Sequence, residues 1–397
     1  MSTDLLQRVE TFVKDVRWVS SSQRDLVADL LGAVSPPQNA GPLINDGQRT
    51  FLQFSTNDYL GLAAAPSIRH RAAEIVARYG ISAPMGSRAM TGTTADHLEL
   101  EAALARHRGC EASLVFATGA SAMMGLLAAL ARPGDVLFLD QFAHASLVCG
   151  AKISGATTVF FRHNDVMHLE HLVRQHASGS AAAIVVDGVY SMQGDLAPLP
   201  ELVEIKNRYG LRLFVDDAHG TGVFGPHGSG TPAHFGVANQ VDVQAGTFSK
   251  ALATIGGFIA GSRTLIDYLR FTAPTFLFTK SLPLAVVAAT QESLSLLIQG
   301  DDLRVRLQRN TRRLQEGLRA GGFDIGRTES PITPIQFAGN DALLVAKRLR
   351  DEHRIWVSPI LHPAVERGRS IIRATPTANH TAAQIDELIE ALTIVGG

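Results

Sequence analysis

The stretch Gly246-Thr247-Phe248-Ser249-Lys250 ends in a lysine and continues a short apolar run at residues 241–245. Upstream, residues 211–215 form another apolar run of the buried-strand type, and Asp216-Asp217-Ala218-His219 follows it directly. Each pattern alone has an ordinary interpretation. A lysine at a strand end is most often a surface residue, and Asp-Asp-Ala-His after a strand is compatible with a metal site or a helix cap.

Taken together, the two segments fit one chemistry well. A lysine amine can form an imine with an aldehyde cofactor, and a buried carboxylate can keep a pyridine nitrogen protonated. Lys250 and Asp216 therefore predict a site for pyridoxal 5'-phosphate (PLP), in which the cofactor acts as an electron sink for a carbanion. We expect no metal ion at this site.

The composition of the 397-residue chain is that of a soluble globular enzyme, with 46% hydrophobic and 18% charged residues. A net charge of −1 gives no sign of a nucleic-acid partner or of a membrane-surface role. Cys110 and Cys149 are the only cysteines and cannot form a CxxC metal site, so we expect a reduced, cytoplasmic protein. We expect neither a signal peptide nor an integral membrane segment, because polar residues and glycines interrupt the apolar runs.

Apolar, β-rich runs alternate with helical patterns through the middle of the chain. The runs lie at residues 113–116, 136–139, 157–161, 182–186, 211–215, 241–245 and 257–260, and the helical patterns at 95–106, 167–175 and 199–209. This alternation predicts an α/β fold with a mostly parallel central sheet covered by helices on both faces. Such sheets bind ligands at the carboxyl ends of their strands, where Asp216 and Lys250 are predicted to lie.

We expect three parts in the chain. Residues 1–49 form an N-terminal arm with helical patterns at 4–16 and 22–31, and residues 50–285 form a large PLP-binding domain. Residues 286–397 form a smaller C-terminal α+β domain. Its helices are predicted at 286–298, 302–318, 342–352 and 382–392.

Further segments follow predicted strands and carry suitable groups. Residues 117–121 open a helix whose backbone N–H groups suit a phosphate, although an ordinary strand-to-helix turn has the same pattern. Thr247 and Ser249 add hydroxyl groups near the lysine. His144 is suited to stacking on a planar ring, or to capping a loop. Ser191 is suited to bonding a phenolic oxygen, or to forming a turn.

The order of these elements resembles that of fold-type I PLP enzymes, and the motifs are similar to those of the α-oxoamine synthases. The matching segments are residues 55–62, 86–93 with His97 and Glu101, 187–195, 216–222, 246–250, 278–283, and Arg373 with 377–381. The resemblance extends over residues 50–395. It implies a fold-type I PLP-dependent transferase.

The resemblance implies roles for the residues around the cofactor ring. Lys250 would carry the cofactor, and Asp216 would pair with the pyridine nitrogen. His144 would stack on the ring, while His219 and Ser191 would lie near the phenolic oxygen. Lys250, Asp216, His144 and His219 would take part in catalysis.

The same resemblance implies a shared phosphate site in a homodimer. Gly119, Ala120 and Thr247 would hold the phosphate, and Thr279 and Ser281 would reach in from a second subunit. The family usually has an aromatic residue where this chain has Ala120. A backbone contact to the phosphate can survive that change, but the packing beside the cofactor or acyl chain must differ.

Asn57 and Arg373 would bind the carboxylate of an amino acid substrate. The planar fork of Arg373 matches a carboxylate with two hydrogen bonds. From the residues alone, an arginine near a C-terminal strand is an ordinary surface residue.

The implied reaction is a decarboxylating Claisen condensation. A small amino acid (serine, alanine or glycine) would lose its Cα proton to Lys250 and attack an acyl thioester. CoA or a carrier protein would leave, CO₂ would follow, and an α-amino ketone would be released. The resemblance thus implies an acyltransferase of primary or secondary metabolism, with sphingolipid synthesis as one example.

The choice of family member rests on local differences. Arg88 is followed by Ala89, where members that use succinyl-CoA with glycine have an Arg-Asn pair, which argues against 5-aminolaevulinate synthesis. Residues 161–165, 246–250, 256–258 and 278–283 are most similar to those of soluble bacterial serine palmitoyltransferases. Members similar to 8-amino-7-oxononanoate synthase or glycine C-acetyltransferase, and secondary-metabolite synthases, stay open as alternatives. A fold-type I aminotransferase or aldol lyase is the alternative of another class.

Overall fold

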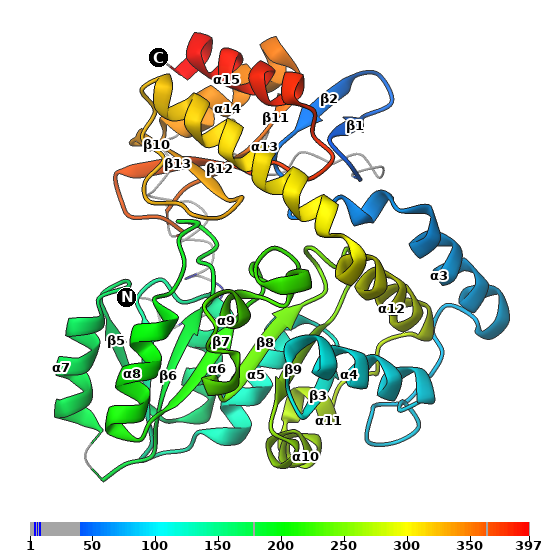
Figure 1. Cartoon of the computed structure of the whole chain (residues 1–397), viewed down its shortest axis with the longest axis vertical. Coiled ribbons are helices and arrows are strands. Elements are labelled where there is room, and N and C mark those ends of the chain that lie inside the picture. The colour runs from blue at the N-terminus through cyan, green and yellow to red at the C-terminus, as the bar shows by residue number, and fades with distance from the viewer. Residues whose placement is uncertain are drawn as a thin grey trace.

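The computed structural model describes Asp4, Leu6, Arg8 and residues 40–396, except residues 178 and 363. These residues form two lobes, a larger one around a seven-stranded sheet and a smaller one that contains the C-terminus (Figure 1). The helices predicted at 4–16 and 22–31 lie largely outside the described residues. Within the described ranges, no helix combines the length and apolar character needed to cross a bilayer.

The large lobe is built on the predicted sheet. Its strands are β3 (Ala112–Phe116), β4 (Val136–Asp140), β5 (Thr157–Phe161), β6 (Ala182–Asp187), β7 (Arg212–Asp216), β8 (Val243–Thr247) and β9 (Gly257–Gly261). Their spatial order is β3-β9-β8-β7-β6-β4-β5. Strand β9 is antiparallel to both of its neighbours, and the pairs from β8 to β5 are parallel. The predicted fold class, a mostly parallel α/β sheet, is confirmed.

Helices cover both faces of this sheet, as predicted. They are α3 (Pro66–Tyr79), α4 (Ala95–Arg108), α5 (Gly119–Leu130), α6 (Ala145–Ser154), α7 (Val166–His176), α8 (Leu199–Tyr209), α9 (Thr231–His234), α10 (Arg263–Thr272), α11 (Pro274–Leu277) and α12 (Leu284–Gln299). In β4, Leu137 and Leu139 belong to the core formed with α5 and α6, whereas Val136 and Phe138 belong to the core formed with α7 and α8. Because successive strand side chains point to opposite faces, such a strand must be apolar throughout.

The small lobe contains two three-stranded sheets. One consists of β1 (Leu43–Asn45), β2 (Thr50–Gln53) and β11 (Ile355–Trp356), and the other of β10 (Thr333–Ala338), β13 (Arg369–Ala374) and β12 (Ser358–Ile360). Helices α13 (Asp301–Ala320), α14 (Asp341–His353) and α15 (Ala382–Gly396) pack against them.

Two elements lie on the other side of the predicted domain boundaries. Strand β2 pairs in parallel with β11, so residues 50–53 belong by their pairing to the small lobe and not to the predicted 50–285 domain. Helix α12 packs on α3 and α4, so residues 286–299 belong by their packing to the large lobe and not to the predicted 286–397 domain. Both differences arise from contacts between segments that are far apart in the sequence.

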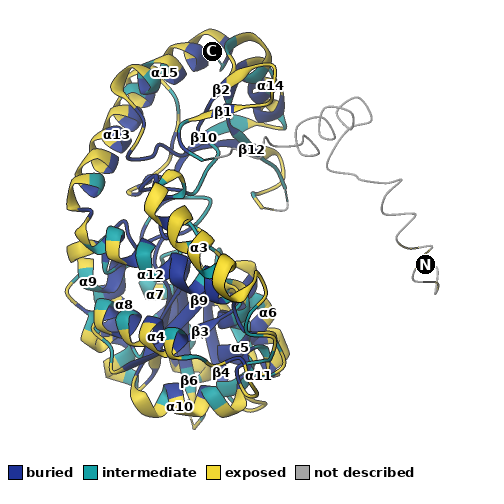
Figure 2. Ribbon diagram, turned by 90° about the vertical axis from the view of Figure 1, so that its right-hand side faces the viewer, coloured by how far each residue is buried: buried dark blue, intermediate teal, exposed yellow. Residues whose placement is uncertain are grey.

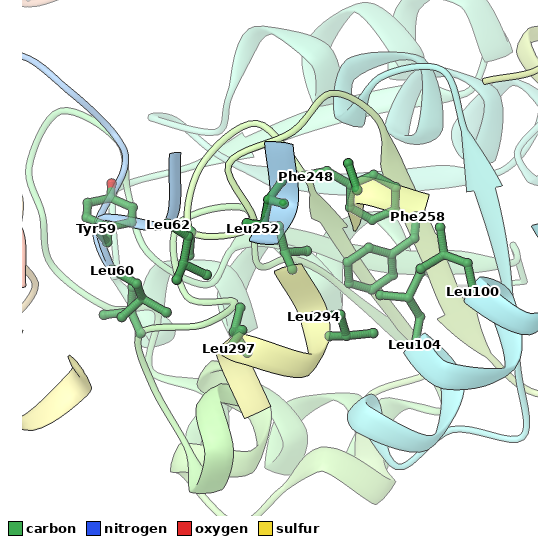
Figure 3. Close-up of a cluster of buried hydrophobic side chains, with 14 of the residues drawn as sticks. Tyr59, Leu60, Leu62, Leu100, Leu104, Phe248, Leu252, Phe258, Leu294 and Leu297 are labelled. Carbon is green, nitrogen blue, oxygen red and sulfur yellow. The ribbon is translucent and has the colours of Figure 1, made fainter. Parts of the chain in front are cut away.

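A buried cluster supports the loop between β8 and β9. Phe248 and Leu252 of this loop pack with Phe258 of β9 and with Leu294 and Leu297 of α12 (Figure 3). The rings of Phe248 and Phe258 are stacked with their centroids 6.0 Å apart. Burying a phenylalanine side chain contributes about 1.5–3 kcal/mol. Figure 2 shows that, in the described part of the chain, buried strands lie inside and exposed helix faces lie outside. The loop that carries Lys250 is therefore anchored in the core.

Candidate active site

Polar side chains stand at the carboxyl ends of four neighbouring strands. Strand β4 ends at Asp140, β6 at Asp187, β7 at Asp216 and β8 at Thr247. Asp187 and Asp216 are direct partners in the parallel register of β6 and β7. Because parallel strands end at one edge of the sheet, these groups gather at a single location.

A cavity of about 340 Å³ opens at this edge. It is lined by Thr118, Gly119, Ala120, His144, Ser146, Asp187, Ser191, Asp216, Ala218, His219, Thr247, Ser249, Lys250, Ile255 and Gly256. Most of the residues predicted from the sequence to surround the cofactor therefore meet in one place. A larger cavity, of about 660 Å³, lies at the opposite ends of the strands beside Val136 and Arg212, remote from the lysine.

Lys250 is held by a short loop that closes on itself between β8 and β9. The backbone N–H of Phe248 donates to the carbonyl of Gly256 at 2.9 Å, and the N–H of Thr254 donates to the carbonyl of Phe248 at 2.9 Å. Burial lowers the pKa of Lys250, the charge of Asp216 opposes this change, and the charge of Arg373 adds to it. A lowered pKa increases the fraction of neutral amine, which is the nucleophilic form.

Two buried carboxylates lie opposite this lysine. Burial raises the pKa of Asp216, and the charge of Lys250 opposes it. Burial and the nearby charge of Asp216 raise the pKa of Asp187 well above its usual value. A cationic ring nitrogen bound here would offset the cost of burying negative charge. The residues present therefore fit a pyridinium ring.

The start of α5 forms the other end of the cavity. Thr118 caps this helix, because its hydroxyl accepts a hydrogen bond from the backbone N–H of Ser121 at 3.0 Å. At Gly119, a Cβ would lie 2.8 Å from the Cβ of Thr247, so only glycine allows this close approach. Thr247 donates its hydroxyl hydrogen to the carbonyl of Gly256 at 3.0 Å. The free N–H groups of the first helical turn can bind a phosphate.

His144 stands at the N-terminus of α6 and lines the cavity. Its Nδ1 accepts a hydrogen bond from the backbone N–H of Ser146 at 3.2 Å and lies 2.7 Å from the Ser146 hydroxyl. Because Nδ1 accepts, a neutral ring carries its proton on Nε2. The backbone N–H of His144 donates to Asp187 Oδ2 at 2.8 Å. This bond fixes the backbone of His144 beside Asp187, and the contacts with Ser146 orient its imidazole.

His219 is buried at the end of the segment that follows β7. Its Nδ1 lies 2.6 Å from the hydroxyl of Tyr59. Burial, together with the charges of Lys250 and Arg373, lowers the pKa of His219 well below its usual value. Burial also raises the pKa of Tyr59. Both side chains are therefore neutral near pH 7.

Arg373 comes from β13 of the small lobe and meets groups of the large lobe. Its Nε donates to the carbonyl of Ser191 at 2.7 Å, and its Nη2 donates to Asn57 Oδ1 at 3.1 Å. Its Nη1 lies 3.4 Å from the hydroxyl of Thr375. The side chain is buried, unlike a surface arginine. These bonds hold a guanidinium group and an amide together beside the Ser191 loop.

Thr279 and Ser281 do not line the cavity of their own chain. The Ser281 hydroxyl donates to the carbonyl of Gly92 at 2.7 Å and lies 2.8 Å from His97 Nε2. Thr279 borders a narrow space beside Arg88. The predicted contact of Thr279 and Ser281 with a second subunit concerns a chain outside the structure, so it stays a prediction.

Two residues of the site have no role predicted from the sequence. Asp187 belongs to a matching motif, and its carboxylate lies beside Asp216 and lines the cavity. Its position directly after an apolar run is the same signal that identified Asp216. Tyr59 also lay in a motif, but nothing local indicates its bond to a histidine that lies 160 residues away. Among the described residues, no group of three or more His, Cys, Asp and Glu side chains has a metal-binding arrangement.

Comparison with known proteins agrees with this geometry. Residues 49–392 match the family model of aminotransferase class I and II. A serine palmitoyltransferase of Sphingobacterium spiritivorum is 40% identical over 350 residues, which cover 88% of this chain and 87% of that protein. An 8-amino-7-oxononanoate synthase of Methylococcus capsulatus is 42% identical over 360 residues, which cover 90% and 92%.

A solved serine palmitoyltransferase from S. paucimobilis, with bound PLP and myriocin, superposes with a TM-score of 0.92 at 31% identity. The superposition covers 99% of this chain and 98% of that one. Together with the buried lysine, the paired carboxylates and the helix N-terminus, these similarities establish the cofactor as PLP and the fold as fold-type I. The chain belongs to the class I and II aminotransferase family and, within it, to the α-oxoamine synthases, which are PLP-dependent C-acyltransferases.

Proposed function

We propose that this chain condenses a small amino acid with an acyl thioester, releases CO₂ and the free thiol, and forms an α-amino ketone, as a serine palmitoyltransferase does. The observation that carries the proposal is the arrangement of Arg373 and Asn57 beside the Lys250 cavity. A carboxylate grip next to a buried amine and a pyridine-binding carboxylate suits an α-amino acid substrate. The relatives supply the second substrate class, since they are C-acyltransferases.

The cofactor would bind between the strand ends and α5. Lys250 would hold its aldehyde carbon, Asp216 its ring nitrogen, and the N–H groups of Gly119 and Ala120 its phosphate. His144 would stack on the ring. When bound, PLP supplies an electron sink that stabilises negative charge on the substrate Cα.

The residues of the chain would then move one proton and hold one carboxylate. The neutral amine of Lys250 would take the proton from the substrate Cα, since its lowered pKa favours the unprotonated form. Arg373 and Asn57 would hold the substrate carboxylate. With the Tyr59 hydroxyl donating to Nδ1, the neutral His219 would donate a hydrogen bond from Nε2. Burial around these groups keeps competing water away from the reacting carbon.

The amino acid and acyl chain are best identified directly. Serine, alanine and glycine should each be incubated with acyl-CoAs of increasing length and with acyl carrier protein thioesters, and α-amino ketones measured by mass spectrometry. Serine with a long acyl chain is the expected pair. Alanine with a pimeloyl thioester would instead support an 8-amino-7-oxononanoate synthase, which the similarity to the Methylococcus capsulatus protein favours as the second candidate.

Proton exchange separates this reaction from transamination. Deuterium should enter the substrate Cα slowly with the amino acid alone and faster once the correct thioester is present. Transfer of the amino group to a keto acid at a comparable rate would contradict the proposal and favour an aminotransferase.

We further propose that the chain is a cytoplasmic homodimer with shared active sites. Large apolar side chains lie exposed on the segments joined by the Ser87–Lys280 bridge, including Met90 and Phe278, which is 86% exposed. Such an exposed apolar surface suits contact with a second copy of this chain. Unpaired Cys110 and Cys149 fit a reducing compartment.

A mixed dimer tests the shared site. Lys250→Ala and Thr279→Asp should each be nearly inactive, the second because it places negative charge beside the partner's phosphate. A mixed dimer would have one site with both changes and one with neither. Random exchange should restore roughly a quarter of wild-type activity, an estimate from symmetry. If mixed dimers form and activity equals the sum of the two parents, the sites are not shared.

A further inference from the structure

His163 lies behind the cavity, between two loops that border it. Its Nδ1 is 2.9 Å from Asp140 Oδ1, and its Nε2 is 2.8 Å from Asp195 Oδ2. The ring packs against Phe142, with the centroids 4.7 Å apart, and against the edge of Tyr190, with the centroids 4.5 Å apart. The imidazole therefore contacts both loops through bonds and through packing.

Each of the two carboxylates belongs to a loop that carries a residue of the site. Asp140 ends β4 and precedes His144 by four residues in the sequence. Its Oδ1 also accepts the backbone N–H of Phe142 at 2.8 Å, which shapes that loop. Asp195 closes the loop that contains Ser191, since its carbonyl accepts the backbone N–H of Tyr190 at 3.0 Å. His163 thus connects the His144 loop with the Ser191 loop.

The next residue strengthens the same connection. The backbone N–H of Asn164 donates to Asp140 Oδ2 at 2.9 Å. Its side-chain amide donates to the carbonyl of Leu196 at 3.0 Å and to Asp195 Oδ2 at 3.2 Å. Asn164 has a φ of 53°, a left-handed conformation that asparagine tolerates better than most residues. Asn164 adopts this conformation at the position where it hydrogen-bonds to both loops.

The two bonds of His163 define its charge. An ionised carboxylate only accepts hydrogen bonds, so two carboxylates on one ring require both nitrogens to donate, as in an imidazolium. Burial lowers the pKa of His163, but the hydrogen bonds and charges of Asp140 and Asp195 outweigh it and raise the pKa to about 9. Other titratable groups around this ring include Tyr190, which packs on it, and Asp187, whose charge acts on Tyr190. On the segment of His163 itself they include His168 and the Arg162–Asp165 pair.

We propose that His163 is a positioning residue, in which one doubly hydrogen-bonded ring ties the loop of His144 to the loop of Ser191 and so sets the width of the cofactor cavity. The inference rests on the proposed placement of PLP against these two residues. A second tie, from the His144 backbone to Asp187, lies at the cavity itself. His163 makes a similar connection through Asp140 and Asp195, outside the residues that line the cavity.

The test compares His163→Gln with His171→Gln in the PLP-bound protein. His171 is an exposed histidine on α7, close in sequence and outside the cavity lining, so its change controls for the loss of one histidine. His163→Gln can bond only one carboxylate well. It should weaken PLP binding about tenfold, by analogy with the lower end of the range for groups that orient metal ligands. It should also reduce the visible circular dichroism of the bound cofactor, and His171→Gln should change neither signal.

A pH series adds a signature that a purely structural role lacks. The cofactor dichroism of the wild type should fall as the pH rises through about 9, while His163→Gln should lack this step. A variant that folds, binds PLP as tightly as His171→Gln and keeps its dichroism would overturn the proposal.

Nitrogen NMR of the unaltered, histidine-labelled protein keeps the proposal testable if His163→Gln does not fold. Both nitrogens of His163 should carry protons at pH 7.5, and a neutral ring there would overturn the proposal. PLP binding, cofactor dichroism and nitrogen NMR do not require turnover. They therefore remain informative if the condensation activity is not found.

Discussion

Asp216 and Asp217 are neighbours at the end of β7, yet the chain surrounds them very differently. Asp217 is fully buried and paired within the protein, with Arg108 Nη2 2.9 Å from its Oδ2 and the Thr231 hydroxyl donating to its Oδ1 at 2.6 Å. Asp216 is also buried, but it faces the cavity and accepts the backbone N–H of Ala218 at 3.1 Å. Asp217 forms a buried ion pair with Arg108, whereas the charge of Lys250 only partly offsets the burial of Asp216.

This difference suits Asp217 to a structural role and Asp216 to the proposed contact with the cofactor. The pair of Arg108 and Asp217 has no exposed side-chain surface, so each partner needs the other. Burial of Asp216 beside Asp187 instead costs stability in the absence of the cofactor, and binding recovers that cost. Active sites commonly sacrifice stability in this way.

The largest expected effect comes from Lys250→Ala. The change removes both the attachment point of the cofactor and the base at Cα, so amino ketone formation should fall by about 10⁴-fold or more. Borohydride should no longer fix the cofactor to the protein, as measured by mass spectrometry of the digested chain. Recovery of the reduced cofactor on another lysine in the wild type would refute the assignment.

The two aspartates should respond in opposite ways to replacement by asparagine. Asp217→Asn leaves Arg108 buried without its partner, so the free energy of unfolding should fall by about 3–5 kcal/mol. Asp216→Asn removes a carboxylate whose burial outweighs the favourable charge of Lys250, so the cofactor-free protein should be at least as stable as the wild type. Urea unfolding of the two cofactor-free variants gives both values. Equal destabilisation by the two changes would break the distinction.

The ion pairs of His163 predict an intermediate effect with a defined pH dependence. Its folded pKa of about 9 lies above the unfolded value of about 6.5, so the protonated ring stabilises the native state. This contribution, about 3 kcal/mol, should be fully present below pH 6.5 and lost as the pH rises through 9. The unfolding free energies of wild type and His163→Gln should therefore converge in alkali. A constant difference from pH 6 to 10 would contradict this account.

The smallest expected effect is that of Arg373→Lys. Lysine keeps the charge but loses the planar fork, so amino acid binding should weaken by about 1–3 kcal/mol, the range for a charged hydrogen bond. Cofactor absorbance should change little, because Arg373 does not line the ring cavity. Unchanged amino acid affinity, measured by spectral titration, would exclude the proposed role.

The parts that sequence predicted well are those with local signals. Most strands of the large sheet are short apolar runs, and β4, β6 and β7 each end in an aspartate, the signal that indicates Asp216. Lys250 and His144 follow strands in the same way. The fold and most of the cavity could therefore be read from neighbouring residues.

The remaining parts depend on contacts between distant segments. Strand β2 pairs with β11, which lies in the C-terminal part of the chain. Arg373 bonds to Asn57, which is 316 residues away in the sequence. No local pattern distinguishes this arginine from a surface residue, and only the family resemblance indicated it. The Ser281 hydroxyl bonds to His97 and Gly92 within its own chain, and its motif does not indicate these bonds.

The closed loop between β8 and β9 determines how the lysine can move. The Ser293 hydroxyl holds the carbonyl of Leu252 at 2.7 Å, and Phe248 is locked in the core, so the backbone around Lys250 is a fixed pivot. Any movement of the Lys250 amine within the cavity must therefore come from rotation about its side-chain bonds. Such rotations are faster than loop or domain motions. If Lys250 carries the cofactor as proposed, its amine would need only side-chain rotation, and no rearrangement of the fold, to leave and return during turnover.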